Sequence, residues 1–216
     1  MNINEKICLA IFSTMLEKIV IKTLFNISLI IVMNNNGSLE LIIGPMFSGK
    51  STELIRQIRR RKTINKKVLV IKPAIDTRYN NKLTSHNFES ENCVVLDNLK
   101  DIETDEINKH DTIVIDEGQF FTDLKENVIN WVDTQNKDVI IGGLDGDFER
   151  KPMGQILDLI PHADKYTKLR ALCKICNDGT DAIFSKRKIN VSNNILIGGE
   201  ESYIPVCRKH YFNNTI

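Results

Sequence analysis

A glycine-rich loop between an apolar run and a helical pattern carries every fixed position of the phosphate-binding pattern G-x-x-x-x-G-K-[ST]. Its residues are Gly44, Pro45, Met46, Phe47, Ser48, Gly49, Lys50 and Ser51. Residues 39–43 form the apolar run, and Leu54, Ile55 and Ile58 recur at helical spacing after the loop. A strand, a loop and a helix in this order direct backbone N–H groups and the positive end of the helix toward phosphate oxygens. The motif therefore predicts a nucleoside triphosphate site; a glycine-rich turn that binds nothing is the alternative.

The loop and a later strand predict how the triphosphate is held. Lys50 would reach the β- and γ-phosphates, and the Ser51 hydroxyl would bind Mg²⁺. Asp116 follows the apolar run 112–115, where a carboxylate holds the Mg²⁺ shell opposite Ser51. Glu117 comes next and can accept a proton from the attacking nucleophile. Nucleic-acid-driven ATPases end this strand in the same way, so the pair alone leaves the nucleophile open.

Composition limits the class of protein. A chain of 216 residues with 42% hydrophobic residues can form one α/β domain with a small appendage. A formal net charge of +1 provides no field for a phosphate polymer, which argues against a nucleic-acid partner. Five cysteines, with Cys8 and Cys93 isolated, do not suggest a disulfide framework. We therefore expect a cytoplasmic protein.

The first 36 residues differ from the rest. Residues 7–32 are strongly apolar, but Glu17, Lys18 and Lys22 interrupt them, so no stretch reaches the length of a membrane span. A small-residue cleavage site is also missing ahead of the domain. We interpret 1–36 as an extension outside the working enzyme, or as translation from an upstream start codon, in preference to a membrane-surface helix. No membrane partner is expected.

Strand and helix patterns alternate along the remaining chain. Apolar runs at 39–43, 67–71, 112–115 and 139–141 indicate strands, and the patterns at 50–62 and 124–134 indicate helices. This alternation predicts a parallel sheet flanked by helices, as in P-loop nucleotide-binding proteins, over 37–168. Ligands of such sheets lie beyond the carboxyl ends of the strands.

Several polar and aromatic residues fall at those carboxyl ends. The predicted triphosphate site adds to the loop the residues Asp76, Thr77, Arg78, Asp116 and Gln119. Arg78 and Arg187 are candidates for cations that converge on the transferred phosphoryl group, although surface ion pairs would explain them equally well. Phe148, Phe120 and Phe121 could pack on a nucleobase, with a role in the core as the alternative.

Four residues near the C-terminus have the spacing of zinc ligands. Cys173 and Cys176 form a C-x₂-C pair, and Cys207 and His210 form a C-x₂-H pair about thirty residues later. Three thiolates and one imidazole suit a tetrahedral structural Zn²⁺ site. A redox role is disfavoured, because the C-x₂-C pair does not open a helix after a first strand. We expect a small zinc-bearing domain over 169–216.

Five segments in this order resemble the cytosolic-type (type II) thymidine kinases of animals, bacteria and large DNA viruses, including poxviruses. They are GPMFSGKSTEL at 44–54, KPAIDTRY at 72–79, DEGQFF at 116–121, LDGDFERKPMG at 144–154 and IGG at 197–199, with Tyr203 before Cys207. The resemblance extends from about residue 38 to 212. Only the N-terminal extension lies outside it.

The resemblance implies transfer of the γ-phosphoryl group of ATP to the 5′-hydroxyl of thymidine, with Glu117 as general base. It places Phe148 against the thymine ring, with Leu144, Phe120 and Arg187 on the same side. It also implies a lasso segment whose backbone reads the base edge and which Tyr203 closes. The lasso residues are Asn194, Ile195, Leu196, Ile197 and Gly198.

The same resemblance implies a homotetramer and feedback inhibition by thymidine triphosphate. The chain departs from the family pattern at His210, where many members have cysteine, at Met153 and at Asn87. Acceptance of deoxyuridine and thymidine analogues therefore stays open. A nucleic-acid-stimulated ATPase with a zinc knuckle, and a catalytically silent nucleotide-binding protein, are the alternative functions.

Overall fold

The structure is a computed structural model that describes Lys22 and residues 36–77, 81–85, 89–188, 198–199 and 201–213. The chain divides into two compact units, Met1–Asn36 and Gly37–Ile216, and everything below concerns the second. Among the described residues, no helix has the length and apolar character needed to cross a bilayer.

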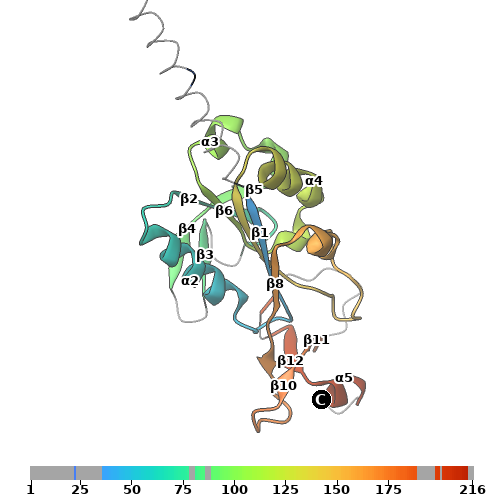
Figure 1. Cartoon of the computed structure of the whole chain (residues 1–216). Helices are drawn as coiled ribbons and strands as arrows, with labels where there is room; N and C mark the ends of the chain where they lie inside the picture. The colour runs from blue at the N-terminus through green and yellow to red at the C-terminus, as the bar shows by residue number, and fades with distance from the viewer. Residues whose placement is uncertain are drawn as a thin grey trace, which may run out of the picture. The chain divides into compact units, whose positions relative to one another are not determined.

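A six-stranded sheet forms the centre of the second unit (Figure 1). The neighbouring strands are parallel, and their order is β5-β2-β6-β7-β1-β8. They are β1 (Ser38–Ile43), β2 (Val68–Pro73), β5 (Val94–Leu96), β6 (Thr112–Ile115), β7 (Asp138–Gly143) and β8 (Lys165–Lys168). The predicted α/β class with a parallel sheet is confirmed.

Helices cover both faces of the sheet, so alternate side chains of one strand enter two different cores. Leu41 and Ile43 of β1 face the core beneath α4 (Leu124–Ile129), whereas Ile42 faces the core beneath α2 (Lys50–Lys62). Figure 1 shows α2 and α4 on opposite sides of the sheet. Burial on both faces explains why the strands are continuous apolar runs.

The second predicted helix differs in detail from the observed one. The pattern at 124–134 indicates one α-helix, but α4 ends at Ile129 and continues as a π-helical turn, η3 (Asn130–Thr134). Both Trp131 and Val132 in this turn are buried in the core. The wider turn thus buries two consecutive bulky side chains.

The two edge strands of the sheet were not predicted from the sequence. Strand β5 has only three residues, and β8 reads Lys-Tyr-Thr-Lys, with Tyr166 largely exposed. The smaller elements around the sheet lie in short connections. They are β3 (Lys82–Thr84), β4 (Ser90–Asn92), η1 (Leu99–Asp101), α3 (Thr104–Asn108), η2 (Gly118–Phe120) and η4 (Ile156–His162).

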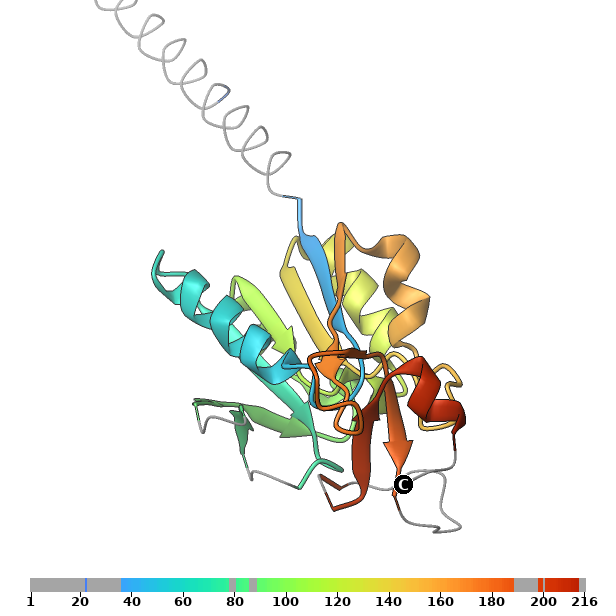
Figure 2. The ribbon, with the colours of Figure 1, turned by 90° about the horizontal axis from the view of Figure 1, so that it is seen from below.

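The described residues after 168 form a small C-terminal lobe that follows directly from β8. It contains two antiparallel pairs and one short helix (Figure 2). They are β9 (Ala171–Leu172) with β10 (Asp181–Ala182), β11 (Phe184–Arg187) with β12 (Tyr203–Val206), and α5 (Arg208–Phe212). The lobe has its own apolar cluster, against which Phe47 of the glycine-rich loop also packs. It therefore lies at the carboxyl end of β1, where the predicted site is.

Candidate active site

The glycine-rich loop connects β1 to α2 and has the backbone that its sequence requires. Gly44 and Gly49 have φ values of +149° and +84°. A Cβ atom at Gly44 would lie 2.6 Å from the carbonyl oxygen of Leu169, so only glycine fits there. Lys50 begins α2, and its ammonium group donates a hydrogen bond of 2.8 Å to the Pro45 carbonyl. This contact folds the lysine back over its own loop.

The loop also has the donors that a phosphate group needs. The hydroxyl group of Ser48 is buried and, among the described residues, has no hydrogen-bond partner. The thirteen-residue helix α2 starts directly after the loop, and Ser51 is its second residue. An orphaned hydroxyl beside the positive end of a helix fits the oxygen atoms of a phosphate.

Three carboxylates gather at the carboxyl ends of β2 and β6. One oxygen atom from each of Asp76, Asp116 and Glu117 lies within 4.8 Å of the others. Asp76 forms an ion pair with the buried Lys72 of β2, with 3.3 Å between Lys72 Nζ and Asp76 Oδ2. Carboxylate oxygens are the donors that Mg²⁺ binds, so this group fits a magnesium ion between the protein and a triphosphate.

Glu117 has an uncommon backbone and a defined partner. Its φ and ψ values of 50° and 43° lie in the left-handed region, which a non-glycine residue adopts only under constraint. The Gln119 amide donates a hydrogen bond of 2.7 Å to Glu117 Oε2 and accepts one of 3.0 Å from the Leu144 N–H group. Gln119 thus connects Glu117 to the segment that follows β7, and its part in binding the triphosphate stays a prediction.

The strand between β1 and β6 leaves room for this connection. Strand β7 ends in Gly142 and Gly143. A Cβ atom at Gly143 would lie 2.7 Å from Cδ1 of Ile156 and would collide with the Gln119 amide oxygen. On the other face, a Cβ atom at Gly142 would lie 2.6 Å from Cδ1 of Leu54 of α2. The two glycines therefore admit α2 and Gln119 to opposite sides of the same strand end.

A second group, of aromatic and cationic side chains, lies between the segment after β7 and the C-terminal lobe. The Arg187 guanidinium group lies 4.1 Å from the centroid of the Phe148 ring and 5.7 Å from that of Tyr203. Its Nη2 atom donates a hydrogen bond of 3.3 Å to the Tyr203 hydroxyl. Three of the predicted acceptor-side residues are therefore in contact, and together they offer a flat cationic and aromatic surface.

The other predicted site residues divide into three groups. Leu144 and Phe120 are half-buried near Gln119, and Thr77 is exposed after Asp76. Gly198 is described, but Arg78, Asn194, Ile195, Leu196 and Ile197 lie outside the described residues. Phe121 is fully buried in the sheet core, so it cannot contact a nucleobase and its alternative role in the core is correct.

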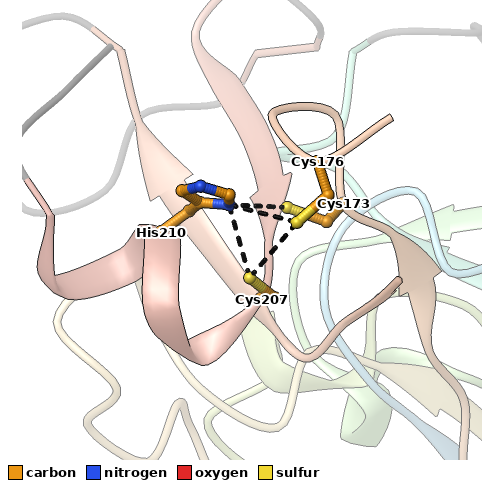
Figure 3. A group of neighbouring side chains, drawn as sticks. All are labelled: Cys173, Cys176, Cys207 and His210. Carbon is orange, nitrogen blue, oxygen red and sulfur yellow. Dashed lines mark hydrogen bonds between the residues drawn. The ribbon is translucent and has the colours of Figure 1, made fainter. Parts of the chain in front are cut away.

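The four predicted zinc ligands converge on one point (Figure 3). His210 Nδ1 lies 3.5, 3.2 and 3.4 Å from the sulfur atoms of Cys173, Cys176 and Cys207, and the last two sulfur atoms are 3.8 Å apart. Zn–S bonds of about 2.3 Å and a Zn–N bond of about 2.0 Å give a tetrahedron with edges of about 3.8 and 3.5 Å. The observed spacing fits that ion, with Nδ1 as the histidine ligand.

The thiols of this cluster depend on one another. Burial works to raise the pKa of Cys173, but hydrogen bonds from the N–H groups of Cys176, Cys207 and Ile175 and from His210 together outweigh it and lower the pKa to about 6. Burial, together with the neighbouring sulfur atoms, raises the pKa of Cys176 to about 11. The Cys173 thiol thus ionises readily, whereas the Cys176 thiol stays protonated. A divalent cation would stabilise both thiolates.

Three residues that contact the site were not predicted from the sequence as site residues. Ser185 of β11 accepts a hydrogen bond of 2.9 Å from the Met46 N–H group, and Tyr211 of α5 donates one of 2.8 Å to the Phe148 carbonyl. Lys72 pairs with Asp76. A lysine inside an apolar strand was the one available signal. The other two contacts join residues more than sixty positions apart.

Comparison with known proteins agrees with this geometry. The family model described as "Thymidine kinase" matches residues 37–211. The chain is 43% identical to thymidine kinase a of Arabidopsis thaliana over 84% of this chain and 77% of the relative, and 43% identical to thymidine kinase 1 of Dictyostelium discoideum over 84% and 80%. It is 45% identical to the thymidine kinase of sheeppox virus strain KS-1 over 82% of this chain and 97% of the relative. With a phosphate loop, a carboxylate group and a Cys₃His cluster in one unit, the chain belongs to the thymidine kinase family.

Proposed function

We propose that this thymidine kinase moves the γ-phosphoryl group of ATP directly to the 5′-hydroxyl of thymidine at a site centred on Glu117. The observation that carries the proposal is the position of Glu117. Its carboxylate lies within 4.8 Å of those of Asp76 and Asp116 on the triphosphate side, and it is connected through Gln119 to Leu144 on the nucleoside side. A base between donor and acceptor is what direct transfer requires.

The donor half consists of the loop from Gly44 to Ser51 with Asp76, Thr77, Arg78 and Asp116. The loop N–H groups, the Ser48 hydroxyl and Lys50 bind the phosphate oxygens. Ser51 and Asp116 would hold Mg²⁺, which would supply positive charge against that of the phosphate groups. The described geometry of the loop and the three carboxylates supports this assignment.

In the transfer step, Glu117 accepts the proton of the 5′-hydroxyl as the oxygen attacks the γ-phosphorus. The new O5′–P bond forms while the bond from the γ-phosphorus to the β,γ-bridging oxygen breaks, and ADP leaves with that electron pair. The products are ADP, thymidine monophosphate and a protonated Glu117. Lys50, Arg78 and the positive end of α2 stabilise the charge on the transferred group.

The acceptor half binds the base between side chains and backbone. Phe148 packs on the thymine ring with one face, and Arg187 lies against the other face of the Phe148 ring. Leu144, Phe120 and Tyr203 line the same pocket. The lasso residues 194–198 read the base edge through backbone groups. The Cys₃His cluster would hold Zn²⁺, which when bound cross-links the chain on either side of the lasso and lowers the entropy lost when that segment orders.

Three further assignments rest on family resemblance and chemistry. We propose a homotetramer and feedback inhibition by thymidine triphosphate, both properties of the family that the chain resembles. We also propose the cytoplasm as its compartment, supported by the free thiols of Cys93 and of the Cys₃His cluster. Size determination in solution and inhibition kinetics with thymidine triphosphate test the first two.

The decisive experiment measures ADP release with Mg²⁺ and ATP in the presence of thymidine or of single-stranded DNA. We expect thymidine alone to stimulate ADP release and thymidine monophosphate to accumulate in equal amount. Stimulation by DNA alone would identify a nucleic-acid-driven ATPase. ADP release without either addition and without nucleotide product would identify a simple hydrolase.

A further inference from the structure

Helix α5 reaches the nucleoside half of the site through one side chain that the family features do not assign. The Tyr211 hydroxyl donates a hydrogen bond of 2.8 Å to the backbone carbonyl of Phe148. Tyr211 comes directly after His210, a residue of the Cys₃His cluster, and its ring packs against the apolar cluster of the C-terminal lobe. The cluster and the proposed thymine-binding ring are therefore separated by one tyrosine.

The segment that carries Phe148 is organised by hydrogen bonds within itself. The Asp147 carboxylate accepts hydrogen bonds of 2.9 and 2.8 Å from the N–H groups of Glu149 and Lys151, which makes a tight turn with Phe148 near its tip. These bonds fix the shape of the turn. They do not fix its position relative to the lobe, which supplies Arg187 and Tyr203.

The lobe contacts the turn from β11, through Arg187 at the Phe148 ring and Phe184 at Arg150, and from α5 through two further contacts. One is the hydrogen bond from Tyr211 to Phe148. The other is Arg150, whose guanidinium group lies 4.8 Å from the ring centroids of both Tyr211 and Phe212. Arg150 has a φ value of +67°, an uncommon conformation for a long side chain that requires support from neighbouring contacts. The turn is thus attached to α5 on both sides of Glu149.

We propose that Tyr211 is a positioning residue that holds Phe148 in register with Arg187 for the nucleoside. Tyr211 does not itself touch the nucleoside. Tyr211 links the Cys₃His cluster to the segment that carries Phe148, so the C-terminal lobe holds the base-packing ring in place. This inference rests on the proposed function, because it takes Phe148 as the base-packing residue.

The test is Tyr211→Phe in the full-length enzyme, which removes the hydroxyl and keeps the ring. We expect the KM and the calorimetric Kd for thymidine to rise about fivefold, the loss of one hydrogen bond. We expect kcat and the KM for ATP to stay within about twofold, because the lost interaction acts on nucleoside binding and not on transfer. Zinc content by mass spectrometry should equal that of the wild type.

Tyr166→Phe is the matched control, because it removes the same group from an exposed tyrosine on the edge strand β8. It should change neither KM. If Tyr211→Phe loses zinc, Arg150→Gln tests the same attachment from the other side, and we expect it to raise the Kd for thymidine about threefold with the zinc retained.

The outcomes separate the inference from the proposed function. A wild-type enzyme that phosphorylates thymidine, with an unchanged thymidine Kd in Tyr211→Phe, overturns the inference alone. Equal increases in the KM for thymidine and for ATP also overturn it, because they indicate general loosening of the lobe. A wild-type enzyme without thymidine-dependent turnover overturns the proposed function, and the inference fails with it.

Discussion

At the scale of single residues, Glu117 combines a left-handed backbone with a position at the meeting point of the two halves of the site. We expect Glu117→Gln to lower kcat by about 10²–10⁴-fold, because the amide cannot accept the proton of the 5′-hydroxyl. ATP affinity should stay close to that of the wild type. Steady-state kinetics and binding of a fluorescent ATP analogue measure the two effects. Glu106→Gln on α3 is the control and should leave turnover unchanged. If Glu117→Gln also leaves turnover unchanged, Glu117 is not the general base.

The buried ion pair of Lys72 and Asp76 allows a prediction about stability. Both side chains are almost completely buried, so Lys72→Met removes a buried cation from beside the Asp76 carboxylate, which lies close to two other carboxylates. We expect the free energy of unfolding to fall by about 3–5 kcal/mol, and the double variant with Asp76→Asn to recover part of the loss. Urea denaturation measures both. Lys109→Met, which breaks an exposed pair with Glu106, should change little, and an equal loss there would contradict the prediction.

Residue roles were predictable from the sequence where a local pattern fixes the chemistry. Lys50 and the two C-x₂ pairs belong to motifs whose spacing alone brings the reactive atoms together. Gln119 and Tyr211 act through contacts with residues 25 and 63 positions away. These contacts depend on how the segment after β7 packs against η2 and α5. No spacing rule could give them before the topology was known.

At the scale of elements, the phosphate loop is attached to the C-terminal lobe at Met46 and Phe47. The Met46 N–H group donates to Ser185, and Phe47, with a φ value of +65°, packs against the apolar cluster of the lobe. We expect Phe47→Ala to raise the Kd for ATP about tenfold, because the packing that helps to offset the unfavourable backbone at this position is lost. Calorimetry with an ATP analogue measures it. Phe47→Leu keeps an apolar side chain and should lose less; equal losses would show that packing is not the cause.

The Cys₃His cluster joins the turn after β9 to the start of α5. Because the four ligands come from two segments, removal of the metal frees the two from each other. We expect chelation to release one Zn²⁺ per chain and to lower the unfolding temperature by about 10 °C. His210→Cys should keep the metal and His210→Ala should lose it, since thiolate replaces imidazole in such sites. If chelation releases no metal, or leaves the melting temperature unchanged, the cluster is not a structural zinc site.

Thiol alkylation gives a second measurement of the same event. Burial raises the pKa of Cys93 to about 11, so this thiol stays protonated and reacts slowly at pH 8. With Cys8 replaced by serine, chelation should therefore add the fast-reacting thiol of Cys173, whose pKa is about 6, whereas Cys176, whose pKa is about 11, should react slowly as Cys93 does. Fast alkylation of Cys93 before chelation would contradict the burial that the structure gives it.

Element prediction from the sequence succeeded where hydrophobic periodicity was strong. The buried strands β1, β2 and β6 and the helix α2 have continuous or periodic apolar residues. The edge strand β8 has a polar sequence and is recruited to the sheet by pairing with β1 rather than by its own propensity. The π-turn η3 depends on the packing of Trp131 and Val132, which local sequence does not encode.

At the scale of the whole molecule, the C-terminal lobe contacts both the proposed donor half and the proposed acceptor half of the site. The phosphate loop contacts it through Met46 and Phe47, and the nucleoside turn contacts it through Tyr211 and Arg150. Both contacts depend on the fold of the lobe, which the Cys₃His cluster would hold together. The cluster is therefore suited to align donor and acceptor as well as to anchor the lasso.

The same unit should work without the residues that precede it. Gly37 packs closely, because a Cβ atom there would lie 2.7 Å from the Lys137 carbonyl oxygen, and the family match also begins at residue 37. Among the residues that the structure describes, those in the cores of the sheet and of the C-terminal lobe run from Leu39 onward. We expect a variant that starts at Met33 to keep kcat and both KM values within about twofold and its unfolding temperature within about 3 °C, since it loses none of these contacts. Kinetics and calorimetry of the two proteins side by side measure this, with a variant that starts at Leu41 as the control that cuts into β1 and should not fold. A loss of thymidine turnover on starting at Met33, with the melting temperature unchanged, would assign the first 32 residues a part in the reaction.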